Sequence, residues 1–311
     1  MKSKLFYLVA LLVLSALPMN AQEKPEILSI SHIAVKASDV EKSVAFYQDF
    51  LGYAETGRLK YKDDGSLMLV FMKVSDTQWL EIFDARRLEK DDRLYQVCFR
   101  VADAEAMRSY LAKFNLAVPA KVNIGQIQNL GFTVRDPRNY IIEFQQYTPE
   151  GWTMRDQGKF LPATRISDHI GHAGIVVEDL AAAQHFYEDI LGLKESWRGS
   201  KDGNAISWLH LKLPESSDFV EFMLETNVVP HFCLEVPDIE AAKAKLEARP
   251  YFPQYDKPME VKIGKNHKRQ LNLYDPDGIR VELMETKTFD GHPVPPSAAP
   301  LPLKKVAGMR R

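Results

Sequence analysis

Two stretches of the sequence share one pattern: SHIAVKASDVEKSVAFYQDFLGY, residues 31–53, and GHAGIVVEDLAAAQHFYEDILGL, residues 171–193. His32 aligns with His172, 140 positions later, and the same spacing aligns Glu81 with Glu221. After a small deletion the match resumes: QVCFRVADAEA at 96–106 matches HFCLEVPDIEA at 231–241, and VRDPRNYIIEF at 134–144 matches LYDPDGIRVEL at 273–283. The chain therefore contains two tandem copies of one domain.

Each copy alternates strands and helices in a fixed order. SHIAVKA is short, β-branched and bounded by polar residues, which indicates a strand, and DVEKSVAFYQDFLG follows with apolar residues at helical spacing. Asp39 stands where it can cap the start of this helix, and Gly52 stands where the helix ends. Three further strands complete the unit, and the second half of each copy repeats the order. The sequence predicts an α+β fold made of four βαβββ units.

The repeats also set the domain boundaries. We expect a first domain at residues 30–148, a linker at 149–168, a second domain at 169–285 and a Pro-rich tail at 286–311. The linker is rich in Gly, Pro and polar residues. The tail has too few apolar residues to fold alone, so we expect it to be extended or disordered.

The N-terminus has the parts of an export signal, which we place at residues 1–21. A short basic start precedes the apolar run LFYLVALLVLSAL at residues 5–17, and PMNAQ offers a cleavage site after Ala21. The run is shorter than the ~20 apolar residues that a membrane-spanning helix needs. We therefore expect a periplasmic or secreted protein that has no membrane association once the signal is removed.

Charge and cysteine content narrow the partners. The 311 residues include 40 Lys and Arg against 42 Asp and Glu, and these charges are interspersed, so no basic stripe marks a nucleic-acid partner. Cys98 and Cys233 occupy equivalent positions in separate domain cores, where we expect buried strand residues and not a disulfide. A small-molecule substrate and a monomer or homodimer are the expectation.

The order of motifs resembles the vicinal oxygen chelate superfamily, which includes glyoxalase I, extradiol ring-cleaving dioxygenases and the bleomycin resistance proteins. The resemblance covers residues 30–285: a strand His precedes D-[VL]-x(5)-FY-x-D-x-LG, and each copy closes on D-P followed by a strand Glu. It implies that each pair of units curls its strands into an open β-cup around a divalent metal ion. The ligands of the family come from the first and fourth strands of each unit.

Carried over residue by residue, the resemblance gives eight candidate metal ligands: His32, Glu81, Gln96, Glu143, His172, Glu221, His231 and Glu282. The four in the second copy are two imidazoles and two carboxylates, a set that can hold Fe, Mn, Ni, Co or Zn. Gln96 is a neutral and weaker donor. We therefore expect the second copy to hold the better site, and the first copy to bind metal poorly or to be structural.

The sequence leaves the pairing of the units open. If neighbouring units pair, the two sites are His32, Glu81, Gln96, Glu143 and His172, Glu221, His231, Glu282. If units pair across the copies, the sites are His32, Glu81, His231, Glu282 and His172, Glu221, Gln96, Glu143. His231 and Glu282 share a site under either scheme.

Three function classes follow from the resemblance. In a glyoxalase-like lyase or isomerase, the metal ion holds two adjacent substrate oxygens while Glu221 or Glu282 moves a proton. In an extradiol dioxygenase, Fe(II) is held by His172, His231 and Glu282, with supporting roles for two further residues. Those two are His267 and Tyr274. The third class is a binding protein that sequesters a ligand without chemistry.

Glu221 favours the glyoxalase-like class, because extradiol enzymes keep no carboxylate ligand near the end of the third unit. The sequence thus predicts an exported metal-dependent lyase or isomerase acting on a small substrate with adjacent oxygens. An exported enzyme would not meet glutathione reliably, so a different oxygenated acid, sugar or ketone is expected. His210 in SWLHLKL has no counterpart in the first copy and receives no role.

Overall fold

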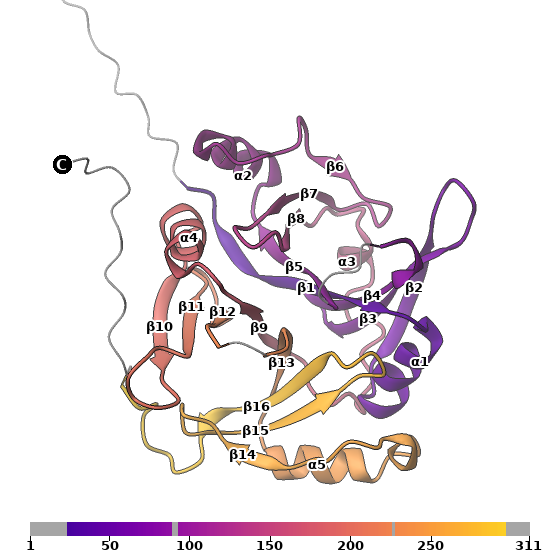
Figure 1. Ribbon diagram of the computed structural model, residues 1–311. Helices are drawn as coiled ribbons and strands as arrows, with labels where there is room; N and C mark the ends of the chain where they lie inside the picture. The colour runs from indigo at the N-terminus through magenta and orange to yellow at the C-terminus, as the bar shows by residue number, and fades with distance from the viewer. Residues whose placement is uncertain (1–23, 89–92, 226–227, 297–311) are drawn as a thin grey trace, which may run out of the picture.

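The computed structural model describes residues 24–88, 93–225 and 228–296. The predicted signal peptide and the end of the predicted tail, residues 297–311, lie outside the described residues. Within the described ranges, no helix is long and apolar enough to cross a membrane. Two sheets, one from each copy, make up most of the fold (Figure 1).

The first copy forms one eight-stranded mixed sheet, the N-terminal cup, with the order β2-β3-β4-β1-β5-β8-β7-β6. Its strands are β1 (Ile27–Ala37), β2 (Ala54–Lys60), β3 (Leu67–Ser75), β4 (Gln78–Asp84), β5 (Leu94–Val101), β6 (Asn123–Ile124), β7 (Leu130–Arg135) and β8 (Ile141–Gln146). Its helices are α1 (Val40–Ala45), which continues as a π-helical turn at Phe46–Phe50, and α2 (Ala104–Leu111). A short helix, α3 (Trp152–Arg155), interrupts the predicted linker.

The second copy repeats this plan as the C-terminal cup, with the order β10-β11-β12-β9-β13-β16-β15-β14. Its strands are β9 (Ile170–Val176), β10 (Lys194–Gly199), β11 (Trp208–Lys212), β12 (Phe219–Met223), β13 (His231–Val236), β14 (Val261–Ile263), β15 (Lys268–Tyr274) and β16 (Arg280–Thr288). Its helices are α4 (Leu180–Gln184), continued by a π-helical turn at His185–Ile190, and α5 (Ile239–Glu247). The predicted α+β fold of four βαβββ units is confirmed, and the units pair within each copy.

The repeated helix has the predicted start and end. The Asp39 carboxylate accepts a hydrogen bond from the backbone N–H of Lys42, and Asp179 does the same for Ala182. The chain leaves the π-helical turn through Gly52, whose φ of +84° lies in the left-handed region that glycine adopts at low cost. The helix therefore ends where the following strand must turn back onto the sheet.

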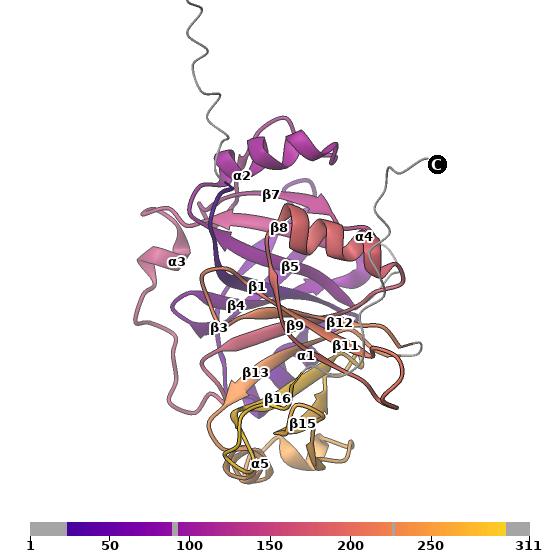
Figure 2. The ribbon, with the colours of Figure 1, turned by 90° about the vertical axis from the view of Figure 1, so that its left-hand side faces the viewer.

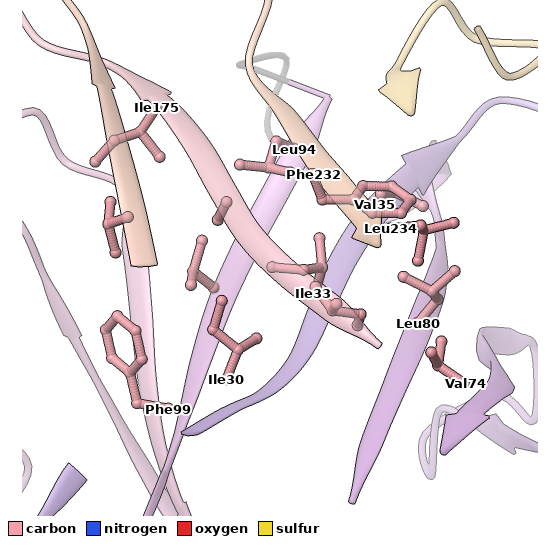
Figure 3. Close-up of a cluster of buried hydrophobic side chains, with 14 of the residues drawn as sticks. Ile30, Ile33, Val35, Val74, Leu80, Leu94, Phe99, Ile175, Phe232 and Leu234 are labelled. Atoms are coloured by element: carbon pink, nitrogen blue, oxygen red, sulfur yellow. The ribbon is translucent and has the colours of Figure 1, made fainter. Parts of the chain in front are cut away.

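Both sheets contribute to one hydrophobic core. Side chains alternate along a strand, so Ile33 and Val35 of β1 point away from the face that carries His32. They belong to one cluster with Phe232 and Leu234 of the second copy (Figure 3). The faces that carry the candidate ligands therefore point away from this shared core, and β1 and β9 are in contact where the two sheets meet (Figure 2).

Helices also tie the copies together. Phe50 of the first copy stacks on Tyr251 of the second, with ring centroids 5.4 Å apart. A second contact joins α2 of the first copy to the π-helical turn of the second, where the Tyr110 hydroxyl donates to the carbonyl oxygen of Ile190 at 2.9 Å. Cys98 and Cys233 are free and buried, as expected.

The last strand of the second copy extends into the predicted tail. β16 continues to Thr288, three residues beyond the predicted domain boundary at residue 285. The tail then passes β10, where the indole N–H of Trp197 donates to the carbonyl oxygen of Pro295 at 3.0 Å. Pairing of the end of β16 with β15 explains the extra length, since Lys268 lies opposite Thr288.

Candidate metal centre and active site

Four predicted residues converge on the inner face of the C-terminal cup. His172 comes from β9, Glu221 from β12, His231 from β13 and Glu282 from β16. The Nε2 atoms of the two histidines lie 3.1 Å apart, and His231 Nε2 lies 3.3 Å from Glu221 Oε2 and 3.5 Å from Glu282 Oε2. Neighbouring-unit pairing is thus the scheme that brings these side chains together.

This donor set fits a divalent metal ion. Ligand atoms at about 2.1 Å from an ion lie roughly 3 Å apart when the bonds are near perpendicular, and the measured separations are close to that value. His172, His231 and Glu282 are all buried, and one ligand atom from each lies within 4.8 Å of the others. Nitrogen and carboxylate donors suit the transition metals of the sequence prediction.

Gly174 leaves space for the His231 ring because it has no side chain. A Cβ on Gly174 would lie 2.0 Å from Cε1 of the His231 ring, and these two residues are paired across β9 and β13. The equivalent pair in the first copy is Ala34 and Gln96. The side chain of Gln96 is narrower than an imidazole ring, so Ala34 fits beside it. The two copies therefore differ at both members of the pair.

Burial sets the protonation of the site. It lowers the pKa of His172 to about 3 and holds the pKa of His231 well below its usual range, so both rings are neutral and can act as ligands. Burial raises the pKa of Glu282 to about 7. Burial would also raise the pKa of Glu221, but the hydrogen bond from His210 and the electrostatic interactions with His231, His210 and His172 together outweigh it and hold that pKa below its usual value.

His210, to which the sequence assigned no role, belongs to the site. Its Nε2 lies 3.0 Å from Glu221 Oε1, because β11 and β12 place the two residues directly opposite each other. Its ring packs between Trp197 and Phe219, with centroids at 4.7 and 4.4 Å. Phe71 holds the equivalent position opposite Glu81 in the first copy, so the repeat gave no signal for this histidine.

A cavity of about 250 Å³ is lined by three of the four predicted ligands, His172, Glu221 and Glu282. Its wall combines aromatic, polar and basic side chains from β10, β11, the β14–β15 hairpin and the start of β16. Those that bear on the chemistry are Trp197, Trp208, His210, Lys262, Lys265 and Arg280. The C-terminal cup therefore has room for a small ligand beside the candidate metal ligands.

The N-terminal cup brings its four predicted residues together as well, with a different result. His32 Nε2 lies 3.5 Å from Glu81 Oε2, 3.3 Å from Glu143 Oε2 and 3.0 Å from the Gln96 amide nitrogen. Burial would lower the pKa of His32, but Cys98 and the two carboxylates raise it well above its usual range. One ligand atom from each of His32, Cys98 and Glu143 lies within 4.8 Å of the others, so this cluster could also hold an ion when the imidazole is neutral, since a protonated imidazole is a poor ligand.

The linker closes the N-terminal cup. The indole of Trp152 packs on Phe71, with ring centroids 5.8 Å apart, and fits where Gly57 has no side chain. The space left beside His32 and Glu81 is only about 20 Å³. The buried ammonium of Lys73 anchors the segment by donating to the carbonyl oxygen of Asp156. At the position of Gly57 the second copy has Trp197, which comes from β10 itself.

Two predicted supporting residues do not line the cavity. His267 lies in the β14–β15 turn with φ +58°, and this turn directs its half-exposed ring toward Phe289 and Asp290. Tyr274 lies at the end of β15, in a separate groove between the copies beside Tyr255. The expected role of both residues beside Glu282 is therefore not supported by their positions.

Comparisons with known proteins agree with this geometry. A family model described as Glyoxalase/Bleomycin resistance protein/Dioxygenase superfamily matches residues 29–144 and 169–283. A lactoylglutathione lyase from Schizosaccharomyces pombe is 22% identical over 309 residues, covering 83% of this chain and 96% of the lyase. Among solved structures, the Mn(II)-bound glyoxalase from Novosphingobium aromaticivorans is similar, with a TM-score of 0.67, 15% identity and 89% of each chain covered.

An extradiol ring-cleaving dioxygenase from B. fuscum is similar to nearly the same degree. Its TM-score is 0.65 at 16% identity, with 91% of this chain and 78% of the dioxygenase covered. At these identities the structural likeness concerns the fold alone, so the choice between reaction classes depends on the residues in the cup.

Proposed function

This chain belongs to the Glyoxalase/Bleomycin resistance protein/Dioxygenase superfamily, and from that membership we propose that it is a metal-dependent lyase or isomerase whose active site is the C-terminal cup. One observation carries the proposal. Glu221 adds a second carboxylate oxygen beside His231, so the site offers two imidazoles and two carboxylates. The substrate would be a small molecule with two adjacent oxygens.

The residues of the cup have distinct tasks in this proposal. A divalent ion held by His172, Glu221, His231 and Glu282 would polarise two adjacent oxygens and acidify the C–H bond beside them. On leaving the ion, the Glu221 carboxylate would accept that proton on Oε2 and return it to the neighbouring carbon, a transfer between two positions of one substrate. His210 holds the other Glu221 oxygen at 3.0 Å and keeps the carboxylate aimed into the cavity.

An Fe(II)-dependent extradiol dioxygenase is the second candidate. The observation that favours it is the set His172, His231 and Glu282, two imidazoles and one carboxylate with ligand atoms within 4.8 Å of one another. In that case Glu221 would be engaged by His210 and would not serve as a ligand. The two candidates differ in whether oxygen is consumed.

Parallel measurement of oxygen uptake and solvent deuterium incorporation tests the proposal. The full chain is loaded with Mn(II) or Fe(II) and incubated with a panel of catechols and of 2-hydroxy and 2-oxo compounds. Deuterium incorporation without oxygen uptake supports the lyase or isomerase. Stoichiometric oxygen uptake with a yellow product from a catechol overturns it in favour of the dioxygenase.

We further propose that the N-terminal cup is structural. Trp152 fills it, and its His32 is surrounded by carboxylates in a closed space. Exchange activity should therefore survive Glu81→Gln, and loss of activity in that variant would contradict this assignment.

A further inference from the structure

We propose that the C-terminal cup selects a substrate that carries a carboxylate, and that Arg280 binds this group. The inference rests on the proposed function and names its substrate class. It starts from a difference between the copies: Arg280 stands opposite His231 on β16, whereas Ile141 stands opposite Gln96 on β8. At this position, therefore, the C-terminal cup has an arginine beside the candidate ligands and the N-terminal cup does not.

Part of the Arg280 guanidinium lacks a hydrogen-bond partner. Its Nη2 contacts the His231 ring and Met223 Sδ and lies 4.0 Å from Glu282 Oε2, but its buried Nε has no hydrogen-bond partner among the described residues. A guanidinium has five N–H donors, and a buried donor without a partner is costly. A planar anion entering the cavity would satisfy several of these donors at once, because a carboxylate matches the guanidinium fork.

The charge of the loaded site points the same way. Glu221 and Glu282 together balance a divalent ion, which leaves the charge of Arg280 uncompensated inside the cup. A substrate with a carboxylate would compensate this charge. Because the side chain of Arg280 is only 21% exposed, water shields this charge less than it would at the surface.

The β14–β15 hairpin adds to the positive wall. Lys265 lines the cavity from this hairpin, and Lys268 follows it at the start of β15. The matching positions of the first copy are Gln126 and Asn129, in an alignment that places Gly264 on Gly125. Three basic residues of the second copy, Arg280 included, are therefore neutral in the first, where the cup is closed.

Cavity size limits the acid. The volume of about 250 Å³ lies below the range of about 300–1,000 Å³ that is typical of pockets for drug-sized ligands. The indoles of Trp197 and Trp208 line it, so a short aliphatic or aromatic group can pack beside the carboxylate. A small 2-hydroxy or 2-oxo acid fits these limits.

Binding of matched acids and amides tests the proposal on the full chain loaded with Mn(II). The probes are lactate, 2-hydroxybutanoate and mandelate, each beside its neutral amide, followed by calorimetry and by the fluorescence of the cavity tryptophans. We expect the acid to bind about 10–100-fold more tightly than its amide, the range of a charge-assisted hydrogen-bonded pair. Equal affinity for acid and amide in all three pairs, or no binding of any acid, overturns the proposal.

Two variants test whether Arg280 causes the preference for the acid over the amide. Arg280→Met should abolish the preference for the acid, and Arg280→Lys should retain part of it, while the bound Mn(II) stays unchanged by elemental analysis. An undiminished preference in Arg280→Met contradicts the role of Arg280, and if that variant does not fold, Arg280→Lys decides by the same ratio. Failure of the proposed function would show differently, as absent metal or as absent deuterium exchange in the wild-type chain.

Discussion

The Tyr47 hydroxyl of the first copy donates a hydrogen bond to Asp275 Oδ2 of the second copy, with 3.1 Å between the oxygens. The reciprocal bond joins Tyr187 of the second copy to Asp136 of the first at 3.0 Å. The Tyr comes from the repeated Phe-Tyr pair and the Asp from the repeated Asp-Pro turn. Two of the motifs that identify the repeat therefore join the copies and lie outside the cups.

The Tyr47–Asp275 bond should make stability depend on pH. Burial raises the pKa of Asp275 to about 6, above the value of about 3.9 expected in an unfolded chain. The folded chain therefore holds this proton more tightly, which stabilises it fully below about pH 4, and the contribution is lost as the pH rises through 6. Above that pH the carboxylate is ionised and depends on the Tyr47 hydroxyl.

We accordingly expect Tyr47→Phe to lower the free energy of unfolding by about 1.5–3 kcal/mol at pH 8, and by less at pH 5, where Asp275 is largely protonated. Urea denaturation at the two pH values measures the difference. Tyr187→Phe is the matched variant, since burial also raises the pKa of Asp136. An equal cost at both pH values would show that the bond does not depend on the charge of Asp275.

Metal binding should depend on the C-terminal cup. Elemental analysis of the purified chain should find about one tightly bound divalent ion, because one cup is open and has two neutral imidazoles. The double variant His231→Ala with Glu282→Ala should lose it. The matched double variant Gln96→Ala with Glu143→Ala should keep it, and full retention in the first variant would contradict the site.

Gly174→Ala adds a single methyl group, but we expect it to lower both the stability of the chain and its metal affinity. The added methyl group would lie 2.0 Å from the His231 ring, so the ring must move away from the other ligands. We expect roughly 1–3 kcal/mol of lost stability from overpacking and a metal affinity reduced by at least about tenfold. Ala34→Gly, the reverse change in the first copy, is the control. Unchanged metal affinity in Gly174→Ala would argue against His231 as a ligand.

Most of the C-terminal site could be predicted because duplication marks residues by register. A His or Glu that recurs at a fixed spacing on equivalent strands must occupy equivalent places, whatever the details of the sheet. Pairing of the units could not be decided, since the local pattern of each unit is the same in either arrangement. Only the observed strand order, with β1 beside β5 and β9 beside β13, distinguishes them.

The missed residues are those that differ between the copies. His210 replaces a phenylalanine and Arg280 an isoleucine, so the repeat pattern gave no signal for either. Trp152 lay in a segment whose composition indicated a linker, and its contact with Phe71 is long-range. The direction of His267 was not predictable because it depends on a left-handed turn at that residue. Differences between the copies thus identify what is specific to each cup.

Export remains a prediction from residues 1–21, which lie outside the described part of the chain. We expect protein recovered from the periplasm or the medium to begin at or near Gln22, because the apolar run at residues 5–17 is typical of an export signal and Ala21 offers a cleavage site after it. N-terminal sequencing of the recovered protein measures this. Recovery of the uncleaved chain from the cytosol would refute it.

The sharpest prediction concerns Glu221 and the reaction. If Glu221 carries the proton, Glu221→Gln should reduce deuterium exchange by roughly 10²–10⁴-fold, the contribution of a positioned acid–base group. His210→Phe, which installs the residue found in the first copy, should lower exchange less, because the carboxylate remains but loses the partner at 3.0 Å. Glu81→Gln in the closed N-terminal cup is the matched control and should leave exchange unchanged. Oxygen uptake is followed in the same samples. Exchange that persists in Glu221→Gln would show that Glu282, and not Glu221, carries the proton. Catechol-dependent oxygen uptake retained in that variant would instead identify an Fe(II) dioxygenase site made of His172, His231 and Glu282.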